Sequence, residues 1–415
     1  MKKEVRPSAI KGTITAPASK SMVQRAIAAA LLSHGKSIIT NPGNSNDCVA
    51  AISIARALGA TVTVLPNSLE IIGTSGITNN HLHCGESGLS IRMFTPIAAS
   101  FSEEISLMGE GSLTIRPMAT MESPLQQLGA YCKTTHGLIP IVVKGPLHGG
   151  KAALDGSLGS QILTGLLMAA PRAKEDVTLQ VKNLQSKPYI DLTLEVMKAF
   201  GVSADNYNYE EFFIKANQKY QPTNFNVEGD WSGAAFLLVA GAIAGRIRVE
   251  NITTSSRQAD KAIMQAIMQA GAIVNEKSNA IEVCHAPLSS FSFDATDCPD
   301  LFPPLVTLAA ACGGVSSIRG VGRLEHKESN RSLALQAEYK KMGINIEVDG
   351  DTMLVTGGPI SAATIDSHND HRIAMATAIS GLTANGTVFI EGAECVAKSY
   401  PAFFDDLNTI CKLPI

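Results

Sequence analysis

Hydrophobic and polar positions along this chain repeat with a period of about 70 residues. Five predicted helices end in an apolar residue, a glycine and a second apolar residue. Alternating apolar and polar positions follow each of them, as at residues 61–65 and 68–72. A glycine directly after a helix is the usual left-handed cap, and such alternation predicts strands. The glycines recur at intervals of 70, 72, 70 and 72 residues, at Gly59, Gly129, Gly201, Gly271 and Gly343.

A second series of predicted helices lies in the other half of each repeat. These helices are small and apolar along their length and polar or charged in their first turn. Their starts lie near Lys20, Ser87, Ser160, Trp231, Asp300 and Asp370. A period of about 70 residues exceeds the 20–50 residues of solenoid repeats, so each repeat is a small module of strands and helices. The pattern therefore predicts six α/β modules.

Six modules predict two domains of three. The polar stretch 217–224 lies midway along the chain and suits a crossing between them. The last helix of the sixth module, residues 401–411, is not followed by strands, so we expect residues 1–17 to complete that module, with a second crossing near residues 17–19. One domain is then residues 19–225, and the other is residues 1–18 plus 226–415. Two adjacent crossings suit a hinge, and we expect the active site in the cleft between the domains.

Composition agrees with this division and excludes several classes of protein. A chain of 415 residues, 45% hydrophobic and 17% charged, is long enough for two domains with large cores. The net charge of −3 provides no general basic surface for nucleic acid, so any anion site must be local. No apolar run reaches the roughly 18 residues of a membrane span, and the start is polar. We therefore expect a cytoplasmic protein that binds no membrane, with its eight scattered cysteines as free thiols.

Cations at predicted helix starts point to anion binding. Ordinary capping explains the serines and aspartates at these starts. It does not explain Lys20, Arg25, Arg92 and Arg372, because cations in a first helical turn oppose the helix dipole. Their recurrence at equivalent places in the repeats predicts a site for phosphate or carboxylate groups.

Two other patterns are weaker evidence for a binding site. Residues 145–151 fit the spacing of a nucleotide-binding phosphate loop, but Ala152 stands where that loop needs Ser or Thr, and the following residues are not helix-like. His81 and His83 share one face of a predicted strand without a third ligand at a convincing spacing, which favours a structural role over a metal site.

An ordered set of short motifs spans nearly the whole chain. In this order the set resembles 5-enolpyruvylshikimate-3-phosphate synthases, although each motif alone is weak. The resemblance implies a two-domain enolpyruvyl transferase fold of six βαβαββ units, described as an inside-out α/β barrel. The motifs are Ser19-Lys20-Ser21 with Arg25, Arg116-Pro117-Met118, Ser160-Gln161, Ser186-Lys187-Pro188-Tyr189, Lys327-Glu328-Ser329 with Arg331, Asp370-His371-Arg372 and Lys398-Ser399-Tyr400-Pro401.

The resemblance also implies a reaction. Phosphoenolpyruvate and shikimate 3-phosphate would give 5-enolpyruvylshikimate 3-phosphate and inorganic phosphate, a step toward chorismate and the aromatic amino acids. These substrates carry phosphates and carboxylates, which suits local cations on a net-acidic chain. By resemblance, shikimate 3-phosphate would contact Lys20, Ser21, Arg25, Ser160, Gln161, Ser186, Asp300, Arg323 and Lys327, with Tyr189 beside them. Phosphoenolpyruvate would contact Lys20, Gly88, Arg116, Gln161, Arg331, Arg372 and Lys398, with Arg92 near the same pocket.

The chemistry implied by the resemblance needs proton transfers at two places. Asp300 matches the family's base for the 5-hydroxyl, which attacks C2 of phosphoenolpyruvate. Glu328 and Lys20 match the groups that move protons at the methyl carbon and at the departing phosphate. Positioned acid–base groups typically contribute 10²–10⁴-fold each. The resemblance implies no metal, no organic cofactor and a monomer.

Four residues depart from the family's usual pattern. Glu86 replaces an asparagine, Leu89 a threonine, Gly159 a serine and Arg323 an asparagine. Gly88, on which glyphosate sensitivity depends in this family, is retained, so glyphosate is an expected inhibitor.

Two alternative functions stay open. The sister enzyme of the same fold transfers enolpyruvyl to UDP-N-acetylglucosamine, but its usual reactive Cys or Asp before an Arg-Pro pair is absent from residues 109–116. A non-catalytic anion-binding protein of the same fold is the other alternative, and it would have no use for Asp300 and Glu328.

Overall fold

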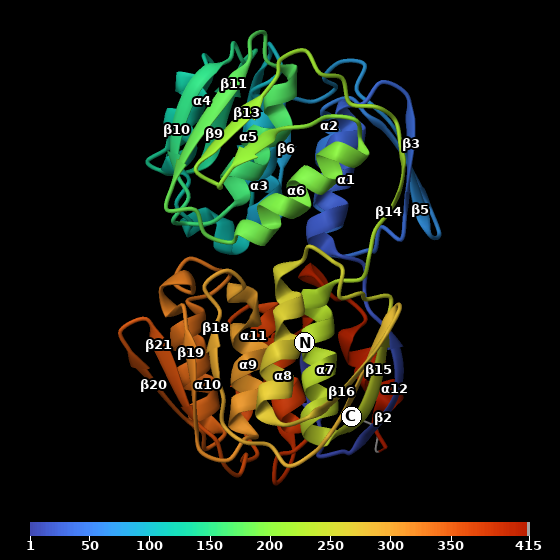
Figure 1. Ribbon diagram of the computed structural model, residues 1–415, viewed down its shortest axis with the longest axis vertical. Coiled ribbons are helices and arrows are strands. Elements are labelled where there is room, and N and C mark those ends of the chain that lie inside the picture. The colour runs from blue at the N-terminus through green and yellow to red at the C-terminus, as the bar shows by residue number, and fades with distance from the viewer. Residues whose placement is uncertain (413–415) are drawn as a thin grey trace. The chain divides into compact units, whose positions relative to one another are not determined.

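The computed structural model describes residues 1–412 and divides the chain into two compact units. The split unit consists of Met1–Pro17 and Gly229–Ile415, and the continuous unit of Ala18–Glu228. The crossings predicted from the sequence lie one and three residues from these boundaries. In Figure 1 the continuous unit runs from blue to green, and most of the split unit runs from yellow-green to red.

The continuous unit contains three modules of mixed helix and strand. Its helices are α1 (Lys20–Leu32), α2 (Asn46–Ala57), α3 (Gly88–Ala98), α4 (Glu122–Gln127), α5 (Gln161–Ala169) and α6 (Lys187–Ala199). Its strands are β3 (Lys36–Thr40), β4 (Thr61–Leu65), β5 (Ser68–Ile72), β6 (His81–His83), β7 (Glu104–Met108), β8 (Tyr131–Thr135), β9 (Leu138–Lys144), β10 (Gly150–Asp155), β11 (Val177–Lys182), β12 (Asp205–Tyr207), β13 (Glu211–Ile214) and β14 (Asn224–Asn226).

The split unit has the same plan. Its helices are α7 (Trp231–Ala244), α8 (Ile263–Ala270), α9 (Phe302–Ala310), α10 (Arg331–Lys341), α11 (His371–Gly381) and α12 (Phe403–Ile410). Its strands are β1 (Lys2–Val5), β2 (Ile10–Thr15), β15 (Gly245–Glu250), β16 (Ile273–Lys277), β17 (Ala280–Cys284), β18 (Ser292–Asp294), β19 (Val315–Arg319), β20 (Asn345–Asp349), β21 (Thr352–Thr356), β22 (Thr364–Asp366) and β23 (Val388–Glu391).

Residues 1–412 form six sheets, one for each predicted module; five have four strands with the same pattern of pairing, and the sixth, β1-β23-β22, has three. In β6-β7-β9-β8, for example, β6 pairs with β7 in parallel across helix α3, and β9 and β8 continue as an antiparallel hairpin. A parallel pair needs a long crossover, which the helix supplies. The prediction of six α/β modules is therefore confirmed.

The strands of residues 1–17 join two different modules, whereas the sequence analysis assigned them all to the sixth. As expected, β1 completes the sixth module, where it pairs antiparallel with β23. The expectation for the rest of residues 1–17 was wrong, because β2 pairs in parallel with β15 and supplies the first strand of the fourth module. Strand β14 likewise pairs with β3 and supplies the first strand of the first module. Each unit thus contains all the strands of its own sheets.

The five glycines that mark the repeat have the predicted left-handed conformation. Their φ angles lie between 77° and 103°, which only glycine adopts without strain. At Gly59 a Cβ atom would also lie 1.8 Å from the carbonyl oxygen of Gly76, so the turn is too tight for a side chain.

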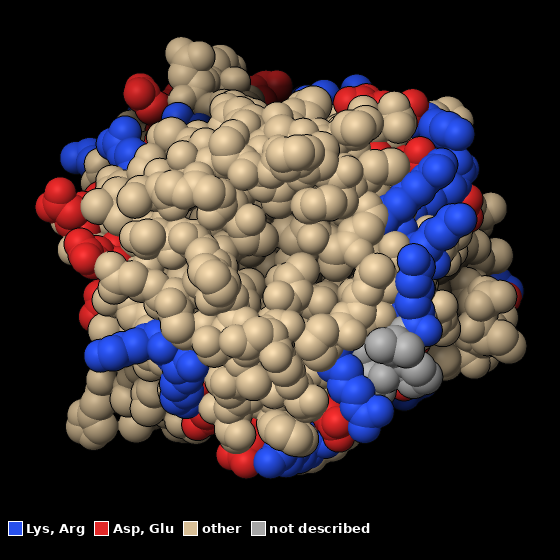
Figure 2. Space-filling model, turned by 90° about the horizontal axis from the view of Figure 1, so that it is seen from below, with Lys and Arg blue, Asp and Glu red and all other residues tan. Residues whose placement is uncertain are grey.

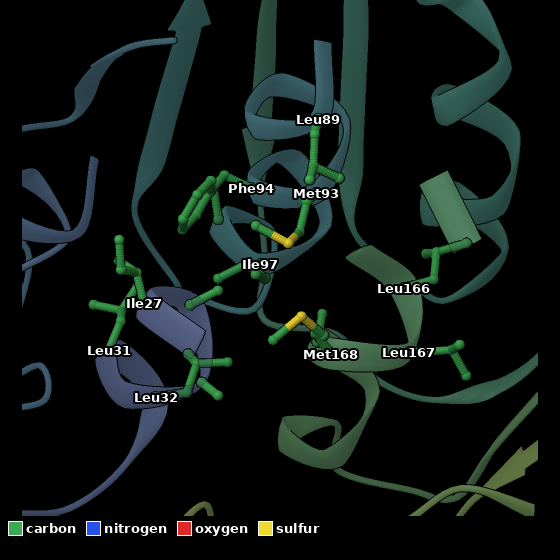
Figure 3. Close-up of a cluster of buried hydrophobic side chains, with 14 of the residues drawn as sticks. Ile27, Leu31, Leu32, Leu89, Met93, Phe94, Ile97, Leu166, Leu167 and Met168 are labelled. Atoms are coloured by element: carbon green, nitrogen blue, oxygen red, sulfur yellow. The ribbon is translucent and has the colours of Figure 1, made fainter. Parts of the chain in front are cut away.

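The core of the continuous unit lies among helices that begin at the predicted polar starts. Figure 3 shows Ile27 and Leu31 of α1, Phe94 and Ile97 of α3, and Met168 of α5 converging in one cluster. All five side chains are fully buried. In the split unit α7, α9 and α11 pack against one another in the same way. Because the apolar bodies of these helices are buried, their polar first turns are left at the ends of the core.

The structure also bears on the phosphate-loop-like stretch, the surface charge, membrane-spanning helices and the cysteines. The phosphate-loop-like stretch leads into strand β10 and not into a helix. Charged side chains lie at the periphery of the face shown in Figure 2, and its middle is uncharged. In residues 1–412 no helix is both long and apolar enough to cross a membrane, and the eight cysteines form no disulfide.

Candidate active site

In the continuous unit, helix α1 presents two of the predicted cations from its first turns. Ser19 caps the helix by accepting a hydrogen bond from the backbone N–H of Met22. Lys20 forms an ion pair with Asp47 in the first turn of α2, with 3.0 Å between Nζ and Oδ2. Both of these side chains are about nine-tenths buried. The cation that opposes the dipole of α1 is therefore compensated by a carboxylate from a neighbouring helix.

Arg25 has a different environment. It is 1% exposed, and its hydrogen-bond partners are neutral oxygens. Burial lowers the pKa of its guanidinium to about 10, which still leaves it charged at neutral pH. An anionic ligand would relieve this buried positive charge.

Gly88 lies where two arginines approach the start of helix α3. A Cβ atom on Gly88 would lie 2.7 Å from Nη1 of Arg116 and 3.1 Å from Nη1 of Arg92. Arg92 donates hydrogen bonds to the side chain of Gln161 and to the carbonyl of Pro117. The structure therefore brings together four predicted residues of this unit, and glycine at position 88 gives the two guanidinium groups their room.

Three departures from the family pattern have local explanations. The Glu86 carboxylate accepts a hydrogen bond from the backbone N–H of Ser112, so it secures a neighbouring loop. Leu89 is 7% exposed and belongs to the hydrophobic core. Gly159 has a φ of 125°, where a serine would be strained.

Two predicted serines stand at helix starts without acting as caps. Ser160 precedes α5 and Ser186 precedes α6, and neither side chain accepts the capping hydrogen bond. Ser186 has a φ of 59°, an unfavourable conformation for a non-glycine residue that is often found at functional sites. Both serines are at least nine-tenths buried.

In the split unit, the predicted residues gather around Arg331. This side chain is fully buried at the start of α10 and is surrounded by three carboxylates. It donates to Asp370 from Nε (2.8 Å), to Asp300 from Nη1 (2.7 Å) and to Glu328 from Nη2. Burial would lower the pKa of Arg331, but the three carboxylates outweigh it and raise the pKa well above the ordinary value.

Asp300, the predicted base, is held by three cations. Its oxygens lie 2.7 Å from Arg331, 3.0 Å from Arg372 and 3.7 Å from Lys327. Burial alone would raise the pKa of Asp300, but Arg372, Lys327 and Arg331 together hold it well below its ordinary value. Asp300 is therefore ionised, and its cationic neighbours lower its basicity.

Burial lowers the pKa of two cations in this cluster, Lys327 and Arg323. Burial lowers the pKa of Lys327 to about 8, although Asp300 opposes the shift. Burial also lowers the pKa of Arg323, which stands where the family usually has asparagine, and Asp297 and Asp300 oppose this shift. Arg323 donates to the carbonyl of Thr296 at 3.4 Å. It therefore lies in the same electrostatic cluster as the predicted base.

The start of helix α11 positions the last two predicted residues. Arg372 donates from Nη1 to Nε2 of His371 at 2.8 Å, so this histidine nitrogen is an acceptor. Lys398 donates to the carbonyl of Asn369, just before the helix, at 2.7 Å. Both cations are at least nine-tenths buried. Ion pairs join Asp300, Lys327, Glu328, Arg331 and Arg372 in one cluster, and Lys398 is connected to the backbone just before Asp370, another partner of Arg331.

Several residues to which the sequence analysis gave no role belong to these clusters. Asp370 is fully buried and accepts from both Arg331 and Ser329. Asp260 is also fully buried, and burial together with the charge of Asp300 raises its pKa to about 6. Ser232 donates a hydrogen bond to Asp260. An aspartate near a helix start resembles an ordinary cap, so the sequence offers no signal that separates Asp47, Asp260 or Asp370 from other caps.

Comparison with known proteins gives a consistent result over the whole chain. The sequence profile of EPSP synthase (3-phosphoshikimate 1-carboxyvinyltransferase) matches residues 5–407. A Clostridium kluyveri protein named 3-phosphoshikimate 1-carboxyvinyltransferase is 36% identical over 410 residues, covering 98% of this chain and 96% of that protein. A Methanocella arvoryzae protein of the same name is 36% identical and covers 98% of each chain.

A solved structure agrees with the sequence comparisons. The structure of EPSP synthase from Acinetobacter baumannii matches with a TM-score of 0.84 at 26% sequence identity, covering 99% of this chain and 98% of the other. The match extends over both units and all six modules, and so does the family profile. This chain therefore belongs to the EPSP synthase family.

Proposed function

We propose that this protein transfers the enolpyruvyl group of phosphoenolpyruvate to the 5-hydroxyl of shikimate 3-phosphate and releases inorganic phosphate. The observation that carries the proposal is Asp300, an ionised carboxylate held by Arg331, Arg372 and Lys327 with Glu328 on the same arginine. A site for anions alone would need the cations but not the two carboxylates. Family membership and the names of the relatives support the same reaction.

The substrate assignments follow the predicted residues. Shikimate 3-phosphate is assigned to Lys20, Ser21, Arg25, Ser160, Gln161, Ser186, Asp300, Arg323 and Lys327. Phosphoenolpyruvate is assigned to Lys20, Gly88, Arg116, Gln161, Arg331, Arg372 and Lys398. Support for these assignments comes from the buried charge of Arg25 and from the approach of Arg116 and Arg92 to Gly88.

In the proposed reaction Asp300 accepts the proton of the 5-hydroxyl as its oxygen bonds to C2 of phosphoenolpyruvate. A proton from Glu328 or Lys20 adds to C3, which gives a tetrahedral intermediate. The C2–O bond to phosphate then breaks with its electron pair leaving on inorganic phosphate, and the group that protonated C3 takes one proton back from it, which restores the double bond. Substrate anions that draw Arg372 and Lys327 away from Asp300 would raise its pKa and make it a stronger base when both substrates are bound.

A phosphate-release assay tests this function. The protein is incubated with phosphoenolpyruvate and either shikimate 3-phosphate or UDP-N-acetylglucosamine as acceptor. Release that depends on shikimate 3-phosphate is the expected result. Release only with UDP-N-acetylglucosamine would assign the sister activity, and release with neither would leave the anion-binding alternative.

Further properties belong to the same proposal. The reaction would serve aromatic amino-acid biosynthesis in the cytoplasm, with the protein acting as a monomer. Glyphosate is expected to inhibit it, because Gly88, on which sensitivity depends in this family, is retained. Substitution of Gly88 by alanine would place a Cβ 2.7 Å from Nη1 of Arg116, so this guanidinium group would have to move, and binding of both ligands is expected to weaken.

A further inference from the structure

The hydrogen bonds of Arg25 fix its guanidinium group without neutralising it. Its Nε donates to the Thr193 hydroxyl at 2.9 Å, and its Nη1 donates to the carbonyl of Ser21 at 2.6 Å. Its Nη2 donates to the Thr164 hydroxyl at 3.3 Å and to the carbonyl of Tyr189 at 3.4 Å. These bonds occupy at most four of its five N–H groups, and all of the acceptors are neutral oxygens.

The two threonines form a directed chain of hydrogen bonds. Thr193 donates its only hydroxyl proton to the carbonyl of Tyr189 at 2.8 Å. It must therefore accept in its 3.0 Å contact with Thr164, whose proton points toward Thr193. Both hydroxyl oxygens then present lone pairs to Arg25. Thr164 on α5 and Thr193 on α6 are fully buried, so water cannot replace either hydroxyl without rearrangement.

This arrangement differs from the usual way of holding a buried arginine. A carboxylate partner would cancel the charge and would compete with an anionic ligand for the guanidinium, as the carboxylates around Arg331 do. Neutral oxygens orient the group and leave its net charge for the ligand. The cost is a buried positive charge in the ligand-free protein, which ligand binding would relieve.

We propose that Thr164 and Thr193 are positioning residues that hold Arg25, with its charge uncompensated, for an anionic group of one substrate. The identity of that substrate as shikimate 3-phosphate rests on the function proposed above. The proposed effect is on binding of this substrate, so the two threonines need not contact either substrate or act in proton transfer.

The test replaces each hydroxyl by a methyl group of similar shape. Thr164→Val and Thr193→Val are compared with the wild-type protein by calorimetric titration with shikimate 3-phosphate alone and by steady-state kinetics. We expect the Kd for shikimate 3-phosphate to rise about tenfold in each variant, since each change removes a hydrogen bond to a charged group. The KM for phosphoenolpyruvate and kcat should change less than about threefold. Thr193→Ser, which keeps the hydroxyl, should recover most of the affinity.

Thr95→Val is the matched control. Thr95 is fully buried on helix α3 of the same unit, and its hydroxyl donates to the carbonyl four residues earlier, as that of Thr193 does. Its hydroxyl bonds to Ile91 and not to Arg25. This variant should show the stability loss of a buried threonine without the loss of affinity. Equal weakening by Thr95→Val, or unchanged affinity in folded Thr164→Val and Thr193→Val proteins, would overturn the proposal.

Failure of the proposed function would give a different result. In that case the wild-type protein would not bind shikimate 3-phosphate at all. The same variants are then titrated with inorganic phosphate as the probe. Weaker phosphate binding in the two threonine variants than in Thr95→Val would still support the positioning role, and equal binding would contradict it.

Discussion

The two units hold their buried arginines in opposite ways. Arg25 is surrounded by neutral oxygens, whereas Arg331 donates to Asp300, Glu328 and Asp370. An arginine with three carboxylate partners has little charge left for a ligand. The structure therefore favours a role for Arg331 in orienting the acid and base groups, in addition to the phosphoenolpyruvate contact expected from the sequence. Two of these carboxylates, Asp300 and Asp370, lie 31 and 39 residues away in the sequence, so no local pattern predicts this charge compensation.

Replacement of Asp300 by asparagine tests the role of the predicted base. The asparagine side chain would keep the shape and could accept through its one carbonyl oxygen from Arg331 or Arg372, which pair with different oxygens of Asp300, but it could not accept a proton. We expect kcat to fall by about 10²–10⁴-fold with the Kd for shikimate 3-phosphate changed less than tenfold. Initial-rate kinetics and calorimetric titration measure the two quantities. Asp294→Asn, at an exposed site on β18, is the control, and near-normal turnover in Asp300→Asn would exclude Asp300 as the base.

The lowered pKa of Lys327 predicts a limit on the alkaline side of the pH profile. Burial lowers the pKa of this ammonium group to about 8, so the free protein loses its positive charge as the pH rises through that value. Because kcat/KM reports the pKa values of the free enzyme, kcat/KM for shikimate 3-phosphate should fall above about pH 8. The second ionisation of a phosphate monoester, near pH 6, is complete below this range.

Lys327→Arg separates this explanation from others. Arginine stays protonated throughout the accessible range, so the alkaline limb should move to higher pH even if the overall rate is reduced. A limb that stays near pH 8 in this variant would assign the titration to another group. The corresponding effect on stability has a definite sign. Below its unfolded pKa the lysine binds more protons in the unfolded state, so the free energy of unfolding should rise between about pH 8 and 10.5.

At the scale of elements, helix α10 braces the turn before α11 at two points. Arg331 at its start binds Asp370, and Glu338 near its end accepts from His368 at 2.8 Å and from the backbone N–H of Asp366 at 3.0 Å. The turn between these points is strained, because His368 and Asn369 both have φ near 50°. Its Asn369 carbonyl is the acceptor for Lys398, so we expect this turn to position the Lys398 ammonium group.

Glu338→Gln tests that brace. The change removes the charge from a carboxylate that is 1% exposed and should reduce stability by about 1–3 kcal/mol. If the turn positions Lys398, the KM for phosphoenolpyruvate should rise several-fold while the Kd for shikimate 3-phosphate stays nearly constant. Thermal unfolding and two-substrate kinetics measure these effects. Glu347→Gln, at an exposed position on β20, is the control, and equal effects on both substrates would indicate general destabilisation.

The elements also show which parts of the fold can be predicted from sequence. Glycine caps and alternating strands are local signals, and they predicted the hairpin of β4 and β5 and the ends of five helices correctly. The partner of β2 was predicted wrongly, because a strand of alternating pattern fits any open sheet edge. Its pairing with β15, more than 200 residues away, depends on the closure of the whole unit. The cation positions were predictable as helix starts, but their carboxylate partners were not.

At the scale of the whole molecule, each unit has its own hydrophobic core and complete sheets. Strand β14 completes the first module of the continuous unit, and β2 the fourth module of the split unit. Neither unit borrows a strand from the other, so each has the features of a domain that folds as a cooperative body. A two-domain chain of this kind is expected to deviate from two-state unfolding in the absence of ligand.

Matched core substitutions make this expectation testable. Leu166 in α5 and Leu305 in α9 are both fully buried, one in each unit. Replacement of either by alanine should cost about 2–5 kcal/mol. In calorimetric scans without ligand, Leu166→Ala should shift only the transition of the continuous unit, and Leu305→Ala only that of the split unit. Because the proposed substrates contact residues of both units, adding both substrates should stabilise both transitions. If each substitution shifts one common transition by the same amount, the chain unfolds as a single cooperative body and the assignment of two independent cores is wrong.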